Sequence, residues 1–177
     1  FAGGTMAAWW IGASDQKRQV VEHHMAVSQL SEDAAALHAP AGLFETRWLM
    51  TKEEVRKLEP GAAPASRDVL TEKRSFYDRP CEVSFQFKVD ALLLASLRFL
   101  DTANPATFDQ TQARLAKEFG RMPKATATNG ASLFSCKLIR HYAIEHHLKA
   151  TNGSPTEEIS FYIRGRGGLA AVSADQR

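Results

Sequence analysis

Strict alternation of apolar and polar side chains over Glu82–Val89 is the strongest constraint on the fold of this chain. Apolar residues occupy every second position of this stretch: Val83, Phe85, Phe87 and Val89. Residues two apart face the same side of a β-strand, so the pattern predicts a sheet with one buried and one solvent-exposed face. Ile159, Phe161 and Ile163 alternate with polar residues in the same way and predict a second strand.

Several other segments favour helices. Thr51 and Glu54 form a capping-box pattern, which predicts a short helix through Leu58. Asn104-Pro105 is a cap followed by proline in the first turn, and Gly120 ends the helix that they begin. Three further helices are expected: one that begins at Ser14-Asp15 and ends before Pro40, one over the apolar run 91–100, and one over 131–150.

These segments predict an α+β fold. We expect a helix-rich single domain over 14–168, with four to five helices packed on a small, mainly antiparallel sheet of two to four strands. A short strand is expected over 43–49, which is rich in aromatic and β-branched residues. Residues 60–66 form a Pro/Gly/Ala loop, 1–13 an apolar N-terminal arm, and 169–177 a flexible C-terminal tail.

Composition sets few limits on function. The 177 residues carry a formal charge of +2 at pH 7, and the isoelectric point is near 8.6, too mild a basicity to indicate nucleic acid by itself. We find no internal repeat of the kind that builds solenoids. The two cysteines, Cys81 and Cys136, lack metal-type spacing and are expected to be free thiols, although a disulfide between them stays open.

The N-terminal arm is unusual because no charged residue precedes Asp15 and because it contains the pair Trp9-Trp10. The chain lacks an initiator Met and resembles the processed or truncated remainder of a longer one. Tryptophan collects where apolar surface meets water, and the arm is too short to cross a bilayer, which takes about 20 residues. We expect it to bind a partner, the core of its own domain or a membrane surface; the alternative is a poorly ordered terminus.

Residues 73–80 combine aromatic and cationic side chains before the main strand. Phe76, Tyr77 and Arg79 are of the types that dominate protein interfaces, so this loop is a candidate partner-binding surface. An equally good interpretation is a loop that packs its own aromatic side chains on the core.

A second candidate surface would bind RNA or single-stranded nucleic acid. Arg164-Gly165-Arg166-Gly167-Gly168 resembles a short arginine–glycine element, and Tyr162 would share the exposed strand face with Arg164. Lys124 and Arg140 would extend the basic patch. The alternative is a solvated strand end followed by a flexible tail, and no RNA-recognition motif or phosphate-binding glycine loop is present.

Two similar segments, Glu22-His23-His24 and Glu145-His146-His147, place histidine and glutamate on the expected helices, with His141 one turn before Glu145. A metal-dependent enzyme built on these residues is the third hypothesis. The Glu-x-x-His spacing of di-iron carboxylate sites is missing in both segments, so we expect no metal and no cofactor. Neither cysteine has the local sequence of a catalytic nucleophile.

The sequence therefore favours a non-catalytic accessory or scaffold subunit of a larger protein assembly. Its partners would be other protein subunits, with membrane-surface contact through Trp9 and Trp10. A mitochondrial or other organellar membrane complex suits the mild basicity and the apolar arm, and a cytoplasmic location is the alternative.

Overall fold

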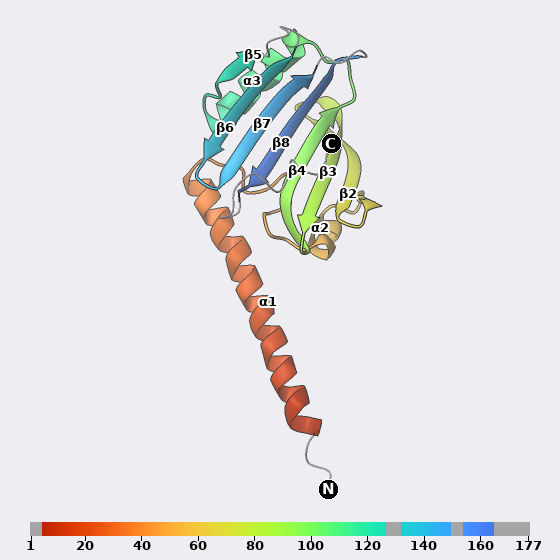
Figure 1. Cartoon of the computed structure of the whole chain (residues 1–177), viewed down its shortest axis with the longest axis vertical. Coiled ribbons are helices and arrows are strands. Elements are labelled where there is room, and N and C mark those ends of the chain that lie inside the picture. Colours follow the sequence, from red (N-terminus) through yellow and green to blue (C-terminus); the bar gives the residue numbers. More distant parts are fainter. Residues whose placement is uncertain (1–4, 127–131, 150–153, 165–177) are drawn as a thin grey trace.

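The computed structural model describes residues 5–126, 132–149 and 154–164, with side chains from residue 19 onward. In these ranges the chain forms three helices and eight strands, and all the strands belong to one antiparallel sheet (Figure 1). The expected helix-rich fold with a small sheet is therefore wrong.

The helices are α1 (Thr5–Ala36), α2 (Lys52–Leu58) and α3 (Pro105–Phe119). Between α2 and α3 lie β1 (Ala63–Ser66), β2 (Val69–Phe76), β3 (Arg79–Lys88) and β4 (Ala91–Phe99). After α3 come β5 (Lys124–Thr126), β6 (Leu133–Ile139), β7 (Tyr142–Lys149) and β8 (Thr156–Ile163).

The sheet has two equivalent halves. Its strand order is β1-β2-β3-β4-β8-β7-β6-β5, so β4 and β8 pair at the centre, with Ser96 opposite Ser160. In each half a helix is followed by a short edge strand and then by three longer strands that run inward in chain order. The halves α2-β1-β2-β3-β4 and α3-β5-β6-β7-β8 thus join through their last strands, an arrangement that the sequence does not reveal as a repeat.

One face of the sheet carries the hydrophobic core. Ala34, Val55 and Leu115, one from each helix, lie in a single buried cluster with strand residues that include Phe85 and Ile159. Phe85 and Ile159 are fully buried, which is worth about 1.5–3 kcal/mol for each side chain. The opposite face is more polar, and in the described part of the chain no helix packs on it.

The expected strands are confirmed over 82–88, as part of β3, and over 159–163, as part of β8. Val89, expected on the buried face, instead lies in the turn after β3 and is 94% exposed. The capping box of Thr51 and Glu54 is also confirmed, because Glu54 N–H donates to Thr51 Oγ1 and Thr51 N–H donates to Glu54 Oε2. Asn104 caps α3, which has Pro105 in its first turn and Gly120 at its C-terminal cap, as the sequence predicts.

The helices expected over 91–100 and 131–150 are wrong: these segments form β4 and the β6–β7 hairpin. An apolar run does not distinguish a central strand, which has neighbours on both sides, from a buried helix. The sequence does not indicate the turns that end these strands, because residues other than glycine adopt the left-handed backbone conformation in them. Val89 and Asp90 have φ of 51° and 58°, and Arg140 has φ of 51°.

Residues 43–49 form turns rather than the expected strand. Trp48 anchors this segment: its indole is fully buried, and its Nε1–H donates to the carbonyl of Pro40 at 2.6 Å. The loop then runs along β4, where Leu49 N–H donates to Leu92 O and Leu92 N–H donates to Met50 O. Hydrogen bonds to Pro40 and to Leu92 of β4 therefore hold this segment in place, although it forms no strand.

Helix α1 extends well beyond the sheet (Figure 1). It begins at Thr5 rather than at Ser14 and continues unbroken across the expected boundary between residues 13 and 14. Its 32 residues span roughly 48 Å. Near its C-terminal end Val27 and Ala34 are buried, and the Tyr142 hydroxyl donates to Leu30 O at 2.7 Å.

Of the remaining expected segments, loop 60–66 contains β1, and the tail 169–177 lies outside the described residues.

Candidate functional site

Residues 73–80, expected to be a partner-binding loop, instead form the end of β2, a two-residue turn and the start of β3, and this hairpin packs on its own domain. The rings of Phe76 and Tyr77 lie 4.1 Å apart, and Phe76 also contacts Phe44 and Phe161 edge-on at 6.1 and 6.4 Å. Burial raises the pKa of Tyr77 most, and the nearby carboxylate of Glu118 raises it further. Both aromatic side chains thus contribute to the core, which is the second of the two interpretations that the sequence left open.

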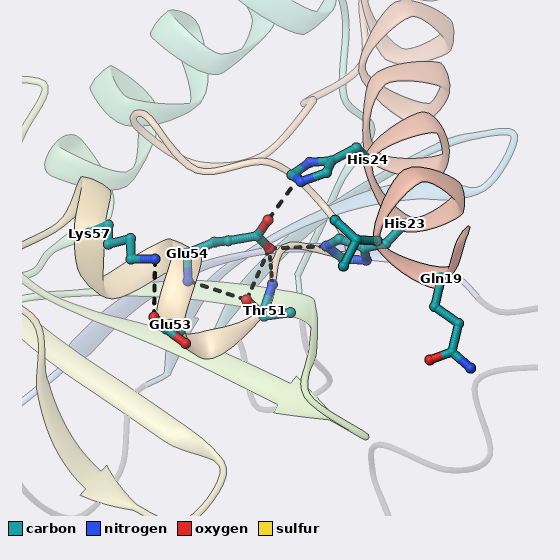
Figure 2. A pocket seen from close by; sticks show the side chains of 8 residues that line it. Gln19, His23, His24, Thr51, Glu53, Glu54 and Lys57 are labelled. Atoms are coloured by element: carbon teal, nitrogen blue, oxygen red, sulfur yellow. Dashed lines mark hydrogen bonds and ion pairs between the residues drawn. The ribbon is translucent and has the colours of Figure 1, made fainter. Parts of the chain in front are cut away.

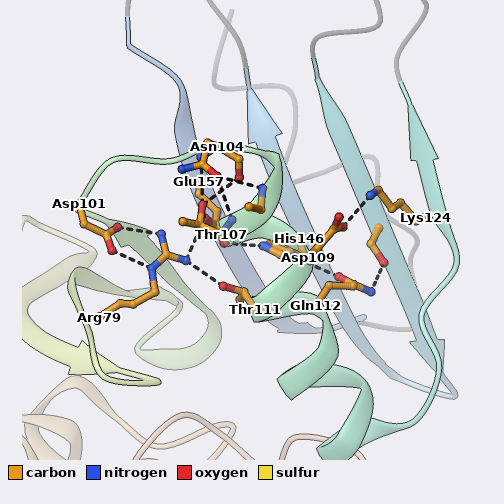
Figure 3. A network of polar contacts seen from close by, with 12 residues as sticks. Arg79, Asp101, Asn104, Thr107, Asp109, Thr111, Gln112, Lys124, His146 and Glu157 are labelled. Carbon is orange, nitrogen blue, oxygen red and sulfur yellow. Dashed lines mark hydrogen bonds and ion pairs between the residues drawn. The ribbon is translucent and has the colours of Figure 1, made fainter.

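Arg79 lies at the start of β3 and is held by four polar contacts inside the fold (Figure 3). Its guanidinium makes a bidentate pair with Asp101, at 2.8 and 2.7 Å, and its Nη1 lies 2.9 Å from Glu157 Oε2 and 2.8 Å from Thr111 Oγ1. Its charged carbon also lies 3.8 Å from the centre of the Phe99 ring. Only 15% of the Arg79 side chain is exposed, so little of it is available to a partner in this conformation.

Arg79 belongs to a larger buried network whose centre is the pair His146 and Glu157 (Figure 3). His146 Nε2 lies 3.0 Å from Glu157 Oε1, and both side chains are fully buried. The imidazole also stacks on Phe108 of α3, with ring centres 3.9 Å apart. Its other nitrogen, Nδ1, lies 2.9 Å from Gln112 Oε1. The network therefore joins β7, β8 and β3 to α3.

The amide of Gln112 determines which hydrogen bonds the His146 ring can form. Gln112 Nε2 donates to Ser135 Oγ at 2.8 Å, so Oε1 points towards His146 Nδ1. In this orientation both ring nitrogens face oxygen atoms, whereas the neutral ring that burial favours donates from only one of them. Loss of one proton requires one nitrogen to become an acceptor, which a 180° turn of the Gln112 amide provides at Nδ1. The protonation of His146 is thus coupled to the orientation of Gln112.

Burial lowers the pKa of His146, although its hydrogen bond to Glu157 opposes this effect. Burial alone would raise the pKa of Glu157, but the hydrogen bond to His146 and the charge of Arg79 outweigh it, and the pKa is lowered.

A histidine, a carboxylate and a serine in one cluster invite comparison with a hydrolase triad. Ser135 bonds to Gln112 rather than to His146, and His146, Glu157 and Ser135 have no exposed surface for a substrate.

A second polar cluster lies on the face of the sheet away from the helices. The Tyr162 hydroxyl donates to Glu145 Oε1 at 2.6 Å, and His147 Nε2 lies 3.2 Å from Glu145 Oε2. The His147 ring also packs on Phe134 with centres 4.7 Å apart. Glu145 puts a negative charge at the middle of this surface, which disfavours a phosphate backbone there.

The residues of the nucleic-acid hypothesis are partly brought together. Arg140 and Arg164 lie at the same end of the sheet. Arg140 is exposed in the β6–β7 turn, and Arg164 N–H donates to the carbonyl of His141, the residue after Arg140, at 2.6 Å. Tyr162 is only 8% exposed, and Lys124, on the edge strand β5, is paired with Asp109 at 2.6 Å. Arg166 lies outside the described residues.

The two histidine-containing segments lie far apart in different settings: Glu22-His23-His24 is on α1, whereas Glu145-His146-His147 is on a strand, β7. In the part of the chain that the structure describes, no three His, Cys, Asp or Glu side chains are placed to hold a metal ion. His23 and His24 instead face Glu54 of α2 across a shallow hollow (Figure 2). The sequence did not indicate this contact, because the partners are 31 and 30 residues apart.

Trp9 and Trp10 belong to the backbone of α1, within the part of the helix that extends from the sheet (Figure 1). Among the described residues, no helix is long and apolar enough to span a bilayer.

Both cysteines are free. Cys81 lies in the buried core on β3, whereas Cys136 is half-buried on β6, in the other half of the sheet. Burial raises the pKa of both thiols, and Glu145 raises that of Cys136 further. Neither environment activates a cysteine nucleophile.

Comparisons with known proteins add little. No family model matches the chain, and no curated protein resembles it significantly. A solved structure of a DUF4309 family protein (YjgB) from Bacillus subtilis is similar over 78% of this chain and 95% of its own, with 13% sequence identity and a TM-score of 0.35. A likeness this distant supports no argument about the fold or the function of this chain.

Proposed function

We propose that this chain is a non-catalytic accessory or scaffold subunit of a larger protein assembly, attached through the apolar segment 1–13. The position of this segment on α1, away from the sheet, supports the proposal. From Thr5 onward it belongs to the helix that leaves the domain, so it is presented away from the sheet (Figure 1).

An isolated helix of this composition needs a partner. Residues 6–13, Met-Ala-Ala-Trp-Trp-Ile-Gly-Ala, are apolar all round, and a helix that projects alone gains no stability from tertiary packing. A hydrophobic groove formed by other subunits, or the surface of a membrane that carries the assembly, would bury them. An organellar membrane complex, such as one of the mitochondrion, fits this attachment.

The internal use of the polar clusters also supports the proposal. His146, Glu157 and Arg79 connect α3 to the sheet, and Phe76 and Tyr77 pack on the core. In the described residues, these side chains stabilise the domain rather than line an open pocket.

The first test is native purification in mild detergent, with mass analysis of every chain that comigrates. We expect a complex with this chain at fixed stoichiometry. A monomer without partners would contradict the proposal, and RNA that copurifies and is released by salt would favour the nucleic-acid alternative.

The second test compares substitutions on α1. Changing Trp9 and Trp10 to Ala should release the chain from the complex and leave its melting temperature unchanged. The matched control is Val20→Ala with Val21→Ala, which removes two exposed apolar side chains, 54% and 56% accessible, nearer the domain. Equal loss of assembly in both double variants would contradict attachment through Trp9 and Trp10.

A further inference from the structure

The turns at one end of the sheet are rich in cations. Because the strands are antiparallel, the β1–β2, β3–β4 and β6–β7 turns all lie at this end, and β8 ends there too. Four cationic side chains belong to it, and we call them the basic end: Arg67, Lys88, Arg140 and Arg164. The first three are exposed and the fourth is half-buried.

The two ends of the sheet differ in how their charges are paired. At the opposite end the ion pairs are Arg79 with Asp101, Arg114 with Asp78, and Lys149 with Glu158. In the described part of the chain, by contrast, none of the four cations of the basic end forms an ion pair. The carboxylates in its turns are Asp68 and Asp90, and Asp90 accepts the backbone N–H of Lys52. The basic end thus keeps an excess of positive charge that the fold itself does not use.

Two aliphatic side chains project among these cations. Val89, which follows Lys88 in the β3–β4 turn, is 94% exposed, and Leu138, two residues before Arg140, is 52% exposed. Val89 also has φ of 51°, a left-handed conformation that a β-branched residue rarely adopts and that costs free energy. A valine in water gains nothing from this arrangement, whereas an apolar layer outside the domain would bury it.

Helix α1 leaves the domain past the basic end (Figure 1). The Tyr142 hydroxyl, next to the β6–β7 turn, donates to Leu30 O, so α1 packs on the sheet at this end. His23 of α1 meets Glu54 of α2, and from there to Ala13, the last residue of the apolar segment, the helix rises about 15 Å. The basic end and the segment 1–13 are therefore presented to the same side of the molecule.

We propose that the basic end docks on an anionic lipid surface, the same surface that holds the segment 1–13. The inference rests on the proposed function in one respect, because this segment must bring the chain to a membrane. Each Lys or Arg close to anionic lipid strengthens binding by about fivefold, and apolar side chains among the cations insert between the headgroups. At physiological salt the attraction decays over about 8 Å, so the basic end docks when α1 leans towards the surface.

A lipid surface fits the basic end better than a nucleic acid does. Proteins that bind single strands stack the bases on aromatic side chains. The exposed apolar side chains here, Val89 and Leu138, are aliphatic, and Tyr162 is only 8% exposed. Lys88 and Arg140 also come from different halves of the sheet, and a flat layer of headgroups can meet both at once.

The test is cosedimentation of the full chain, at physiological salt, with vesicles of phosphatidylcholine alone and of phosphatidylcholine mixed equally with phosphatidylglycerol. We expect tighter binding to the anionic vesicles, and the difference should vanish at about 1 M salt, where charges are screened within about 3 Å. Lys88→Gln with Arg140→Asn should weaken binding to the anionic vesicles roughly 25-fold and leave binding to the neutral ones unchanged. Asparagine tolerates the left-handed conformation of residue 140.

Arg98→Gln with Arg114→Gln is the matched control, because it removes the same charge from side chains that pair elsewhere, with Glu82 and Asp78. It should bind both kinds of vesicle like the wild type. Melting temperatures report whether each variant is folded. Equal affinity of the wild type for the two vesicles, an equal loss in the matched control, or tighter binding to single-stranded RNA than to anionic vesicles would overturn the docking proposal.

Trp9→Ala with Trp10→Ala tests the proposed function separately. Binding to both kinds of vesicle should fall by the same factor, so that the preference for anionic lipid remains. If this variant keeps the wild-type affinity for both, attachment to lipid through segment 1–13 fails while the docking of the basic end stands.

Discussion

His146 and Glu157 meet with a nitrogen–oxygen separation of 3.0 Å, and neither side chain has any exposed surface. They come from adjacent strands, β7 and β8, and Arg79 from β3 forms an ion pair with the same carboxylate. Water cannot solvate His146 or Glu157 if either loses its partner, because both side chains are fully buried. The network is therefore expected to make the stability of the domain sensitive both to pH and to substitution.

Acidification should destabilise the fold. Burial lowers the pKa of His146 in the folded state, so below about pH 6.5 the unfolded chain binds this proton more readily. The pKa of Glu157 is also lowered, so its contribution, complete above about pH 4.5, is lost as the pH falls through its folded value. Urea unfolding between pH 7.5 and 5 should show a declining free energy of unfolding.

The variant His146→Gln should flatten this decline, because it removes the buried titrating ring. His141→Gln, at an exposed turn position, is the control and should keep the wild-type slope. A slope that is unchanged in His146→Gln would show that the pH dependence arises elsewhere.

Neighbouring glutamates of β8 should respond very differently to neutralisation. Glu157→Gln leaves the Arg79 guanidinium and the His146 ring without their buried carboxylate and should cost about 3 kcal/mol. Glu158→Gln removes a carboxylate that only approaches Lys149 at 3.9 Å near the surface, and should change stability by less than about 0.5 kcal/mol. Equal losses in chemical denaturation would refute the distinction.

Trp48 should be the tryptophan on which stability depends. Trp48→Phe keeps an aromatic ring but removes the hydrogen bond to Pro40 O, and should cost about 2 kcal/mol, a fall in melting temperature of about 4–8 °C. Trp10→Phe is the control and should melt like the wild type. The two thermal unfolding curves, recorded under the same conditions, decide between these expectations.

All three tyrosines should resist ionisation in the folded protein. Burial raises the pKa of Tyr77, Tyr142 and Tyr162, and the carboxylates of Glu118, Asp33 and Glu145 respectively raise it further. An absorbance titration should therefore show little phenolate at pH 10 until the chain unfolds. Because the unfolded tyrosines ionise near pH 10, stability should fall above that pH. Ionisation of one tyrosine near pH 10 without unfolding would contradict this prediction.

Local chemistry explains which elements could be predicted. The cap of α2 is completed within four residues, Thr51 to Glu54, and the cap of α3 begins at Asn104 and ends in its first turn. The alternation in β3 needs only its own sequence and one buried face. Interactions of this kind are contained in a short window, so pattern and propensity are sufficient to identify them.

The candidate site residues were less predictable. Arg79 and the pair Phe76 and Tyr77 could be selected by type from the sequence, but not their contacts with Glu157 and Phe161. The sequence predicted His146 as part of a possible metal site on a helix. In the structure it belongs to a strand, and its ring lies between Glu157 and Gln112. Glu157 gave no signal, and Glu54 was predicted only as part of the capping box, because their partners His146 and His23 are not close to them in sequence.

The sequence by itself determined the helix caps, two strands and the apolar character of the segment before Asp15, since each depends on neighbouring residues. Only the tertiary structure decided that the apolar run 91–100 becomes the central strand β4. A strand is stable there because β3 and β8 pair with both of its edges, and β8 begins more than fifty residues later in the chain. That long-range pairing creates the eight-stranded sheet, and with it the burial that gives His146 and Glu157 their chemistry.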